Sequence, residues 1–240
     1  LKNYTESLGL IYLSTPFSRS AANFLNEIGV EAFKIGSGEA DNLPLIEHIA
    51  NFGKPIIMST GMHSFSSLKS SVDIIESYGL DYALLECTSA YPTPPETVRL
   101  SAITEIKQHF PSAIVGFSDH SIGTTMSIAA CALGAKIIEK HFTDTRYRNG
   151  PDIVCSMDPT ELRLLIDRSA EIHHALQSKK EQLSIEKSVY QFARSSVVAD
   201  RDIKKGQKIA QKDIWARRPG NGEIAGYDYG KVLGMTARID

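Results

Sequence analysis

Two histidines that end short apolar runs are the residues whose type and placement most directly suggest chemistry. His120 closes "GFSDH" and His141 closes the run in "IIEKHF". Both runs resemble buried strands, and neighbouring parallel strands would bring the two imidazoles to the same edge of a sheet. Two neutral imidazoles suit a divalent transition metal and leave positions open for a substrate. The alternative is that each histidine is a polar strand-end residue that bonds to the backbone.

A lysine and two glycines follow another apolar run, in "KIGSGE" from Lys34 to Glu39. Gly36 and Gly38 allow backbone N–H groups to approach an anion closely, and Lys34 supplies a compact positive charge. The same residue types fit two alternatives. One is a tight turn with a surface lysine, and the other is a Schiff-base lysine of the kind that class I aldolases use.

Hydroxyl side chains stand at the ends of further runs, and several of them together with a lysine favour an anion or phosphate site. They are Ser14, Thr15, Ser59, Thr60 and Ser118. A single Ser or Thr in such a place is usually the N-cap of the next helix. The turn "RRPGNG", Arg217 to Gly222, is interpreted as a surface turn, with a guanidinium offered to a polar ligand as the alternative.

Short apolar runs alternate with helix-like segments through residues 8–178, which predicts βα units around a parallel sheet. Several helix-like segments end at glycine, as at Gly29, Gly53 and Gly79. An open doubly wound sheet and a (β/α)8 barrel both fit this rhythm. We favour the barrel, because polar residues follow every run and a barrel builds its site from the carboxyl ends of its strands. The six expected strands lie within residues 9–17, 32–39, 55–62, 82–92, 113–120 and 136–144.

A change of composition after residue 178 predicts a second domain. Residues 179–193 are mixed and polar without a clear period, which is typical of a linker. Residues 194–240 are β-like and contain the turn signals "KKGQ" and "PGNG". We therefore expect a barrel domain over residues 1–178, a linker over 179–193 and a small β-rich domain over 194–240. Since six strands do not close a barrel, we expect two more strands before Leu1 and a small domain that is also cut at its end.

The composition excludes several classes of protein. The 240 residues are 42% hydrophobic with a formal net charge of -2, so no overall field favours nucleic acid or an anionic membrane. The longest apolar runs are far shorter than the ~20 residues that a membrane span needs. Three widely spaced cysteines and the lack of a signal peptide indicate reduced thiols and a cytoplasmic protein.

Seven stretches of the chain together resemble the bacterial-type sialic acid synthase (N-acetylneuraminate synthase) family. They are "LSTPF", "FKIGSGE", "PIIMSTGM", "CTSAYPTP", "GFSDH", "EKHFTDTRYRNGPDIVCSMDP" and "WARRPGNGE". The resemblance covers essentially the whole chain, and the sixth stretch is long enough to be specific. It implies a (β/α)8 TIM-type barrel followed by an antifreeze-like (SAF) domain. It also implies a domain-swapped homodimer, in which the small domain of one subunit covers the barrel mouth of the other.

The resemblance implies a reaction in which phosphoenolpyruvate, N-acetylmannosamine and water give N-acetylneuraminate and phosphate. His120 and His141 match metal-binding histidines, usually of Mn²⁺, with Mg²⁺ and Co²⁺ as alternatives. Arg218 matches an arginine that the partner's small domain offers to the N-acyl group, and Phe192 lines the same pocket. The positions around phosphoenolpyruvate are Thr15, Lys34, Ser37, Ser59 and Ser118. Those near the sugar or the metal-bound water are Glu39, Ser89, Tyr91 and Asp152.

The implied catalytic residues are Lys34, Glu39, Tyr91 and Asp152, with Glu39 accepting a proton from the attacking water. Two departures from the family pattern stand out. The first two barrel strands, with an acidic residue and another lysine, are absent from this chain. Glu86 stands where relatives often have His, and strand alternation directs it away from the histidine pair.

Three other functions compete with N-acetylneuraminate synthesis. A sister synthase would use a 2,4-diacetamido hexose to make legionaminic or pseudaminic acid. A Schiff-base aldolase would use Lys34 and no metal. A non-catalytic sugar-binding fragment would bind these ligands without releasing phosphate.

Overall fold

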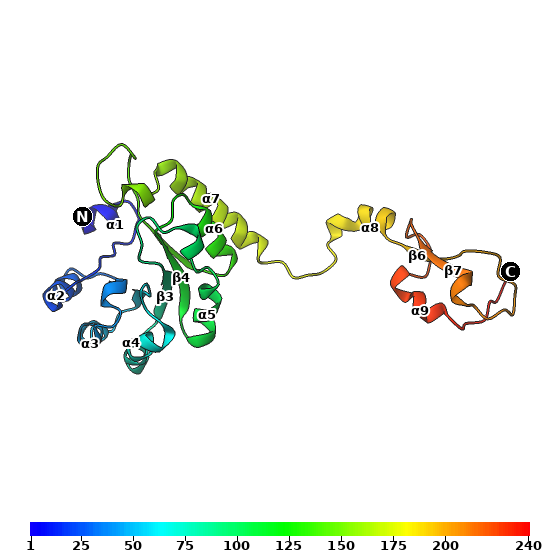
Figure 1. Ribbon diagram of the computed structural model, residues 1–240, viewed down its shortest axis with the longest axis horizontal. Helices are drawn as coiled ribbons and strands as arrows, with labels where there is room; N and C mark the ends of the chain where they lie inside the picture. Colours follow the sequence, from blue (N-terminus) through cyan, green and yellow to red (C-terminus); the bar gives the residue numbers. More distant parts are fainter. The chain divides into compact units, whose positions relative to one another are not determined.

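The computed structural model describes residues 1–240 and divides them into two compact units, Leu1–Ser178 and Lys179–Asp240 (Figure 1). Each unit has a sheet of its own. No helix in either unit is long and apolar enough to cross a membrane.

The first unit is built on a five-stranded parallel sheet that curls into a half-barrel (Figure 1). Its strands are paired in chain order without a reversal. An open doubly wound sheet reverses its strand order at a switch point, so the sequential order favours the barrel-type interpretation. The strands are β1 (Phe33–Ile35), β2 (Ile56–Ser59), β3 (Tyr82–Cys87), β4 (Ile114–Asp119) and β5 (Ile137–Lys140).

Helices alternate with these strands, as the sequence predicts, and lie around the outside of the curled sheet (Figure 1). Gly29, Gly53 and Gly79 follow helices with φ values of 75°, 69° and 66°, which confirms the helix ends that the sequence predicts. The helices are α1 (Lys2–Ser7), α2 (Arg19–Glu27), α3 (Leu43–Ala50), α4 (Phe65–Ser77), α5 (Ala102–His109), α6 (Thr125–Ala132) and α7 (Pro159–Ala175).

Alternation along the strands separates an apolar outer face from a polar inner face. The side chains on the outer face join the buried core that the helices cover; among them are Phe33, Ile35, Met58, Leu84, Val115 and Phe117. The intervening residues face the opposite side, and they include Lys34, Ser59, Cys87, Ser118 and Glu139. The sheet therefore presents a row of polar groups at the carboxyl ends of its strands.

The strand predicted within residues 9–17 is wrong. Residues 10–16 are extended but belong to no strand, and the sheet has five strands rather than six. A strand needs a hydrogen-bonded neighbour, and this segment has none. Leu10 and Ile11 are accordingly 59% and 64% exposed. Thr15 and Phe17 nevertheless line the inner side of the half-barrel.

The second unit is built on a two-stranded antiparallel sheet of β6 (Ser196–Ala199) and β7 (Ile214–Arg217), with α9 (Tyr229–Val232). The buried carboxylate of Asp213 joins its loops, because it accepts bonds from Arg201 and the Ala210 N–H. The predicted linker over residues 179–193 is not wholly irregular, since it contains α8 (Lys187–Ala193).

Candidate active site

A cavity of about 410 Å³ opens at the carboxyl ends of the five strands. Every strand contributes at least one polar or thiol group at or just beyond its last residue, which is how barrel enzymes assemble their sites. The lining residues are Thr15, Phe17, Lys34, Gly36, Ser37, Ser59, Cys87, Tyr91, Ser118, His120, Glu139, Lys140 and His141.

Lys34 lies in the wall of this cavity. It is 8% exposed, and its Nζ donates to Ser59 Oγ at 2.8 Å and to the carbonyl of Ile35 at 3.2 Å. A buried ammonium with a hydroxyl beside it and an open cavity in front suits a phosphate or carboxylate ligand. The structure thus places Lys34 inside the cavity and contradicts the alternative of a surface lysine.

Glu139 is a cavity residue that the sequence analysis does not select. Its Oε2 accepts a hydrogen bond from Ser118 Oγ at 2.7 Å and lies 3.4 Å from Ser59 Oγ. Its Oε1 is 3.4 Å from Lys34 Nζ. Glu139 lies in β5 two residues before His141, which directly follows that strand. This period of two is the signal that puts both side chains on the same face.

The two histidines lie next to each other, as their places at adjacent strand ends predict. Their ring centroids are 5.3 Å apart. His120 Nδ1 is 3.0 Å from the carbonyl of Thr88. Because a carbonyl oxygen can only accept, Nδ1 carries the proton and the lone pair of Nε2 is left for another ligand. The ring of Tyr91 lies 4.1 Å from that of His120 and 5.8 Å from that of His141.

The surroundings of His141 favour the neutral imidazole, which is the form that binds metals. Burial lowers its pKa and the nearby His120 lowers it further, while the Asp152 carboxylate acts in the opposite direction. Asp152 Oδ2 is 3.7 Å from His141 Nδ1. A 3₁₀ turn over Ile153–Cys155 begins directly after Asp152, and the carbonyl of Asp152 accepts a bond from Ser156 Oγ at 2.7 Å.

The donor set fits a divalent metal with open positions. The structure contains no cluster of three or more His, Cys, Asp and Glu side chains arranged as a closed metal site. It does bring together two imidazoles, one of them oriented by a backbone carbonyl, with a carboxylate beside the other. Oriented histidines of this kind are typical metal ligands, and two of them leave room for a substrate.

Ser37, Ser89 and Glu39 are placed differently around the cavity. Ser37 lines it, and its Oγ accepts a bond from the Gly61 N–H at 3.0 Å. A Cβ at Gly61 would stand 2.3 Å from Ser89 Oγ, so glycine lets this turn approach the ends of the neighbouring strands. Glu39 does not line the cavity, and its Oε2 accepts a bond from Asn42 at 2.6 Å.

Phe192 and Arg218 belong to the second unit, and both are exposed. Their roles therefore stay predictions. The thiol of Cys87, which the sequence analysis does not select, is buried in the cavity wall beside Ser37 and Ser118, and this burial raises its pKa.

The fold and this cavity define an α/β protein whose curled parallel sheet brings a lysine, several hydroxyl groups and a histidine pair together in one cavity. The chain belongs to the NeuB family, whose model matches residues 1–181, and a SAF domain matches residues 194–240. These matches confirm the predicted resemblance to the sialic acid synthases and the predicted small SAF domain.

Its relatives include named synthases. The chain is 38% identical over 239 residues to N,N'-diacetyllegionaminic acid synthase of Campylobacter jejuni, covering 98% of this chain and 71% of that protein. It is 36% identical to human N-acetylneuraminate-9-phosphate synthase, covering 99% of this chain and 66% of that protein.

A solved structure is also similar. The N-acetylneuraminic acid synthetase of Leptospira borgpetersenii superposes with a TM-score of 0.75 at 35% identity, covering 78% of this chain and 66% of that one. The chain spans about two thirds of the length of the curated relatives it matches.

Proposed function

We propose that the protein is a nonulosonic acid synthase that condenses phosphoenolpyruvate with N-acetylmannosamine and water to give N-acetylneuraminate and phosphate. The observation that carries the proposal is the meeting, in one cavity, of a cationic hydroxyl-rich pocket and a histidine pair. The names of its relatives support a synthase of this kind.

Lys34, Ser59 and Ser118 are proposed to hold the phosphate and carboxylate of phosphoenolpyruvate. Ammonium and hydroxyl groups that are already fixed make charge-assisted bonds to these oxygens without reorganising. Thr15 and Ser37 line the same cavity and add donors. The contribution of these residues is positioning and electrostatic stabilisation rather than proton transfer.

His120 and His141 are proposed to hold a divalent metal, most simply Mn²⁺, with Mg²⁺ and Co²⁺ as alternatives. When bound, such an ion supplies Lewis acidity toward the aldehyde of the open-chain sugar. Tyr91 packs beside both imidazoles, and the Asp152 carboxylate lies at the edge of His141. We propose that Tyr91 and Asp152 orient the sugar next to this site.

The proposed condensation moves protons as well as forming and breaking bonds. The C3 carbon of phosphoenolpyruvate bonds to the aldehyde carbon, whose oxygen becomes a hydroxyl. Water adds at C2 and passes one proton, by way of a base, to that aldehyde oxygen. The C2–O bond to phosphate then breaks as C2 becomes a carbonyl, and the second proton of the water leaves with the phosphate. We propose that Glu139 accepts the proton of the attacking water, since it lies in the cavity, whereas Glu39 is bonded to Asn42 outside it.

Three further parts of the proposal rest on the family resemblance. They are the closed (β/α)8 barrel, the domain-swapped homodimer with Phe192 and Arg218 at its sugar pocket, and a cytoplasmic location. The sequential strand order supports the first of these. Three free cysteines are consistent with the last.

A sister synthase is the second candidate, because the relatives include a diacetyllegionaminic acid synthase at an identity close to that of the N-acetylneuraminate-9-phosphate synthase. The test compares kcat/KM for N-acetylmannosamine and a 2,4-diacetamido hexose, by phosphate release from phosphoenolpyruvate. We expect the full-length protein to prefer N-acetylmannosamine. Preference for the diacetamido sugar would transfer the protein to the sister synthases, and sugar binding without release from either would overturn the enzyme assignment.

A further inference from the structure

A buried ion pair lies on the side of β4 and β5 that faces away from the two histidines. Asp119 ends β4, Lys140 ends β5, and the two residues are aligned across the parallel ladder. Lys140 Nζ is 3.1 Å from Asp119 Oδ2, and both side chains are at most 1% exposed. Since side chains alternate along a strand, the next residues, His120 and His141, point toward the cavity.

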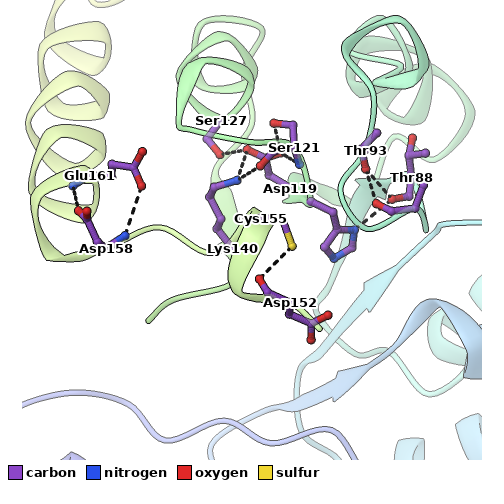
Figure 2. A network of polar contacts seen from close by, with 12 residues as sticks. Thr88, Thr93, Asp119, Ser121, Ser127, Lys140, Asp152, Cys155, Asp158 and Glu161 are labelled. Carbon is purple, nitrogen blue, oxygen red and sulfur yellow. Dashed lines mark hydrogen bonds and ion pairs between the residues drawn. The ribbon is translucent and has the colours of Figure 1, made fainter. Parts of the chain in front are cut away.

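Hydrogen bonds with Ser121 and Ser127 support the two charges (Figure 2). Asp119 Oδ1 accepts from the N–H and the hydroxyl of Ser121, at 2.8 and 2.7 Å. Its Oδ2 accepts from Ser127 of α6 at 2.6 Å, and Lys140 Nζ donates to the carbonyl of Ser121 at 2.7 Å. Satisfied networks of this kind fix one arrangement of the groups that they join.

An apolar pair of similar volume would stabilise this layer about as well, because two buried charges lose their hydration. The charged pair differs in that its hydrogen bonds are directional and fix the orientation of the two strand ends. β4 is the one strand that pairs with β5 in the sheet, and just beyond β5 the carbonyl of His141 accepts a bond from the Met157 N–H at 2.9 Å. The end of β5 is therefore held by the β4 ladder, by Met157 and by Lys140. His120 follows Asp119 in the chain, and His141 follows Lys140. A shift at this last rung of the ladder would therefore move His141 relative to His120.

We infer that Asp119 and Lys140 are positioning residues that hold His120 and His141 at the separation at which both can bind one divalent cation. The inference rests on the proposed function, since it takes the two imidazoles as metal ligands. Neither residue is proposed to touch the substrate. Their effect passes through the peptide bonds to the two histidines and through the register of β4 against β5.

Two variants test this role. Lys140→Met leaves the Asp119 carboxylate buried without its partner and puts folding at risk. The double variant Asp119→Asn with Lys140→Met leaves no unpaired charge, keeps the bonds that residue 119 accepts from Ser121, and is expected to fold. The matched control is Ile49→Ala, which opens a cavity in the fully buried core around α3, away from β5.

The measurement is a titration of the full-length protein with Mn²⁺ alone, in which free Mn²⁺ is followed by electron paramagnetic resonance. We expect the folded double variant to bind Mn²⁺ about 10- to 100-fold more weakly than the wild type, the usual loss when the groups that orient metal ligands are removed. Ile49→Ala is expected to melt at a lower temperature and to keep the wild-type affinity.

Unchanged Mn²⁺ affinity in the folded double variant would overturn the positioning role and leave the proposed function intact. An equal loss of affinity in Ile49→Ala would also overturn it, because general destabilisation would then account for the effect. A wild-type protein that binds no Mn²⁺ would overturn the metal assignment itself, and the inference with it.

Discussion

Lys34 is the residue on which the anion-binding half of the site depends. Lys34→Met removes the one ammonium whose contacts join β1, β2 and β5 inside the cavity. Charge-assisted hydrogen bonds contribute about 1.5–3 kcal/mol, so we expect roughly 10- to 100-fold weaker binding of phosphoenolpyruvate. Calorimetry would measure the change. The control is Lys69→Met on the exposed face of α4, and equal affinity in Lys34→Met and this control would contradict the assignment.

Glu139 and Glu39 are the two carboxylates that compete for the proton-accepting role. Glu139→Gln keeps the shape and removes the base, and general base catalysis contributes about 10²- to 10⁴-fold in rate. We therefore expect kcat for phosphate release to fall by about that factor in Glu139→Gln and by less in Glu39→Gln. Glu47→Gln, on the exposed side of α3, serves as the unchanged reference. A larger loss in Glu39→Gln would return the role to Glu39.

At the residue scale, the sequence predicts which polar groups lie at strand ends. It predicts less well which contacts these groups make. The type and place of His120, His141 and Lys34 are sufficient to predict that they share one site. The residue types of Glu139, Asp119 and Lys140 do not predict their places, because a charged residue in a short strand can face either side of the sheet. Only the packing of α6 and β5 decides which of these side chains enters the cavity and which is buried behind it.

Secondary structure in the first unit follows from local signals wherever a strand has at least one hydrogen-bonded neighbour. Serine and asparagine caps begin α2 and α3, and Asp158 with Glu161 forms a capping box at the start of α7 (Figure 2). The strand predicted within residues 9–17 does not form, because no neighbouring strand pairs with this segment. An apolar run specifies a strand only together with a partner, and that partner is not a property of the run itself.

β3 carries a pH-sensitive group on its outer face. Burial raises the pKa of Glu86 to about 7. The guanidinium of Arg99, 3.0 Å from Glu86 Oε1, lowers this pKa but by less than burial raises it. The folded protein thus keeps a proton that the unfolded chain releases near pH 4.5. The resulting stabilisation is complete below that pH and is lost as the pH rises through about 7.

Glu86→Gln is therefore expected to remove this dependence. Between pH 5 and 7, the free energy of unfolding of the wild type should fall relative to the variant by up to about 1.4 kcal/mol per pH unit. Urea denaturation of both proteins at several pH values would give the difference. Parallel curves for the two proteins would show that Glu86 is ionised in the folded state throughout this range.

The boundary between the two compact units lies close to a change of composition in the sequence. The contacts separate residues 1–178 from 179–240, close to the place where the regular alternation of strands and helices ends. The sequence does not reveal α8, because seven residues of mixed polarity carry no clear helical period.

Domain swapping can be tested by mixing two inactive variants. In a swapped homodimer each site combines the barrel of one subunit with Arg218 of the other. Mixing Arg218→Ala with His141→Ala subunits should then restore about a quarter of wild-type activity, since half of the dimers are mixed and one of their two sites is intact. The mixture should stay inactive if each site uses its own subunit's Arg218.

We propose that one cavity holds phosphoenolpyruvate next to the open-chain sugar, with His120 and His141 as the residues that would hold a metal beside the aldehyde. The most direct measurement is phosphate release by the full-length protein, with phosphoenolpyruvate, N-acetylmannosamine and Mn²⁺ together and with each one left out. We predict release only when all three are present, and its loss with a chelator or in His141→Ala. Release that persists without metal, or covalent trapping of pyruvate on Lys34 by borohydride, would contradict this account.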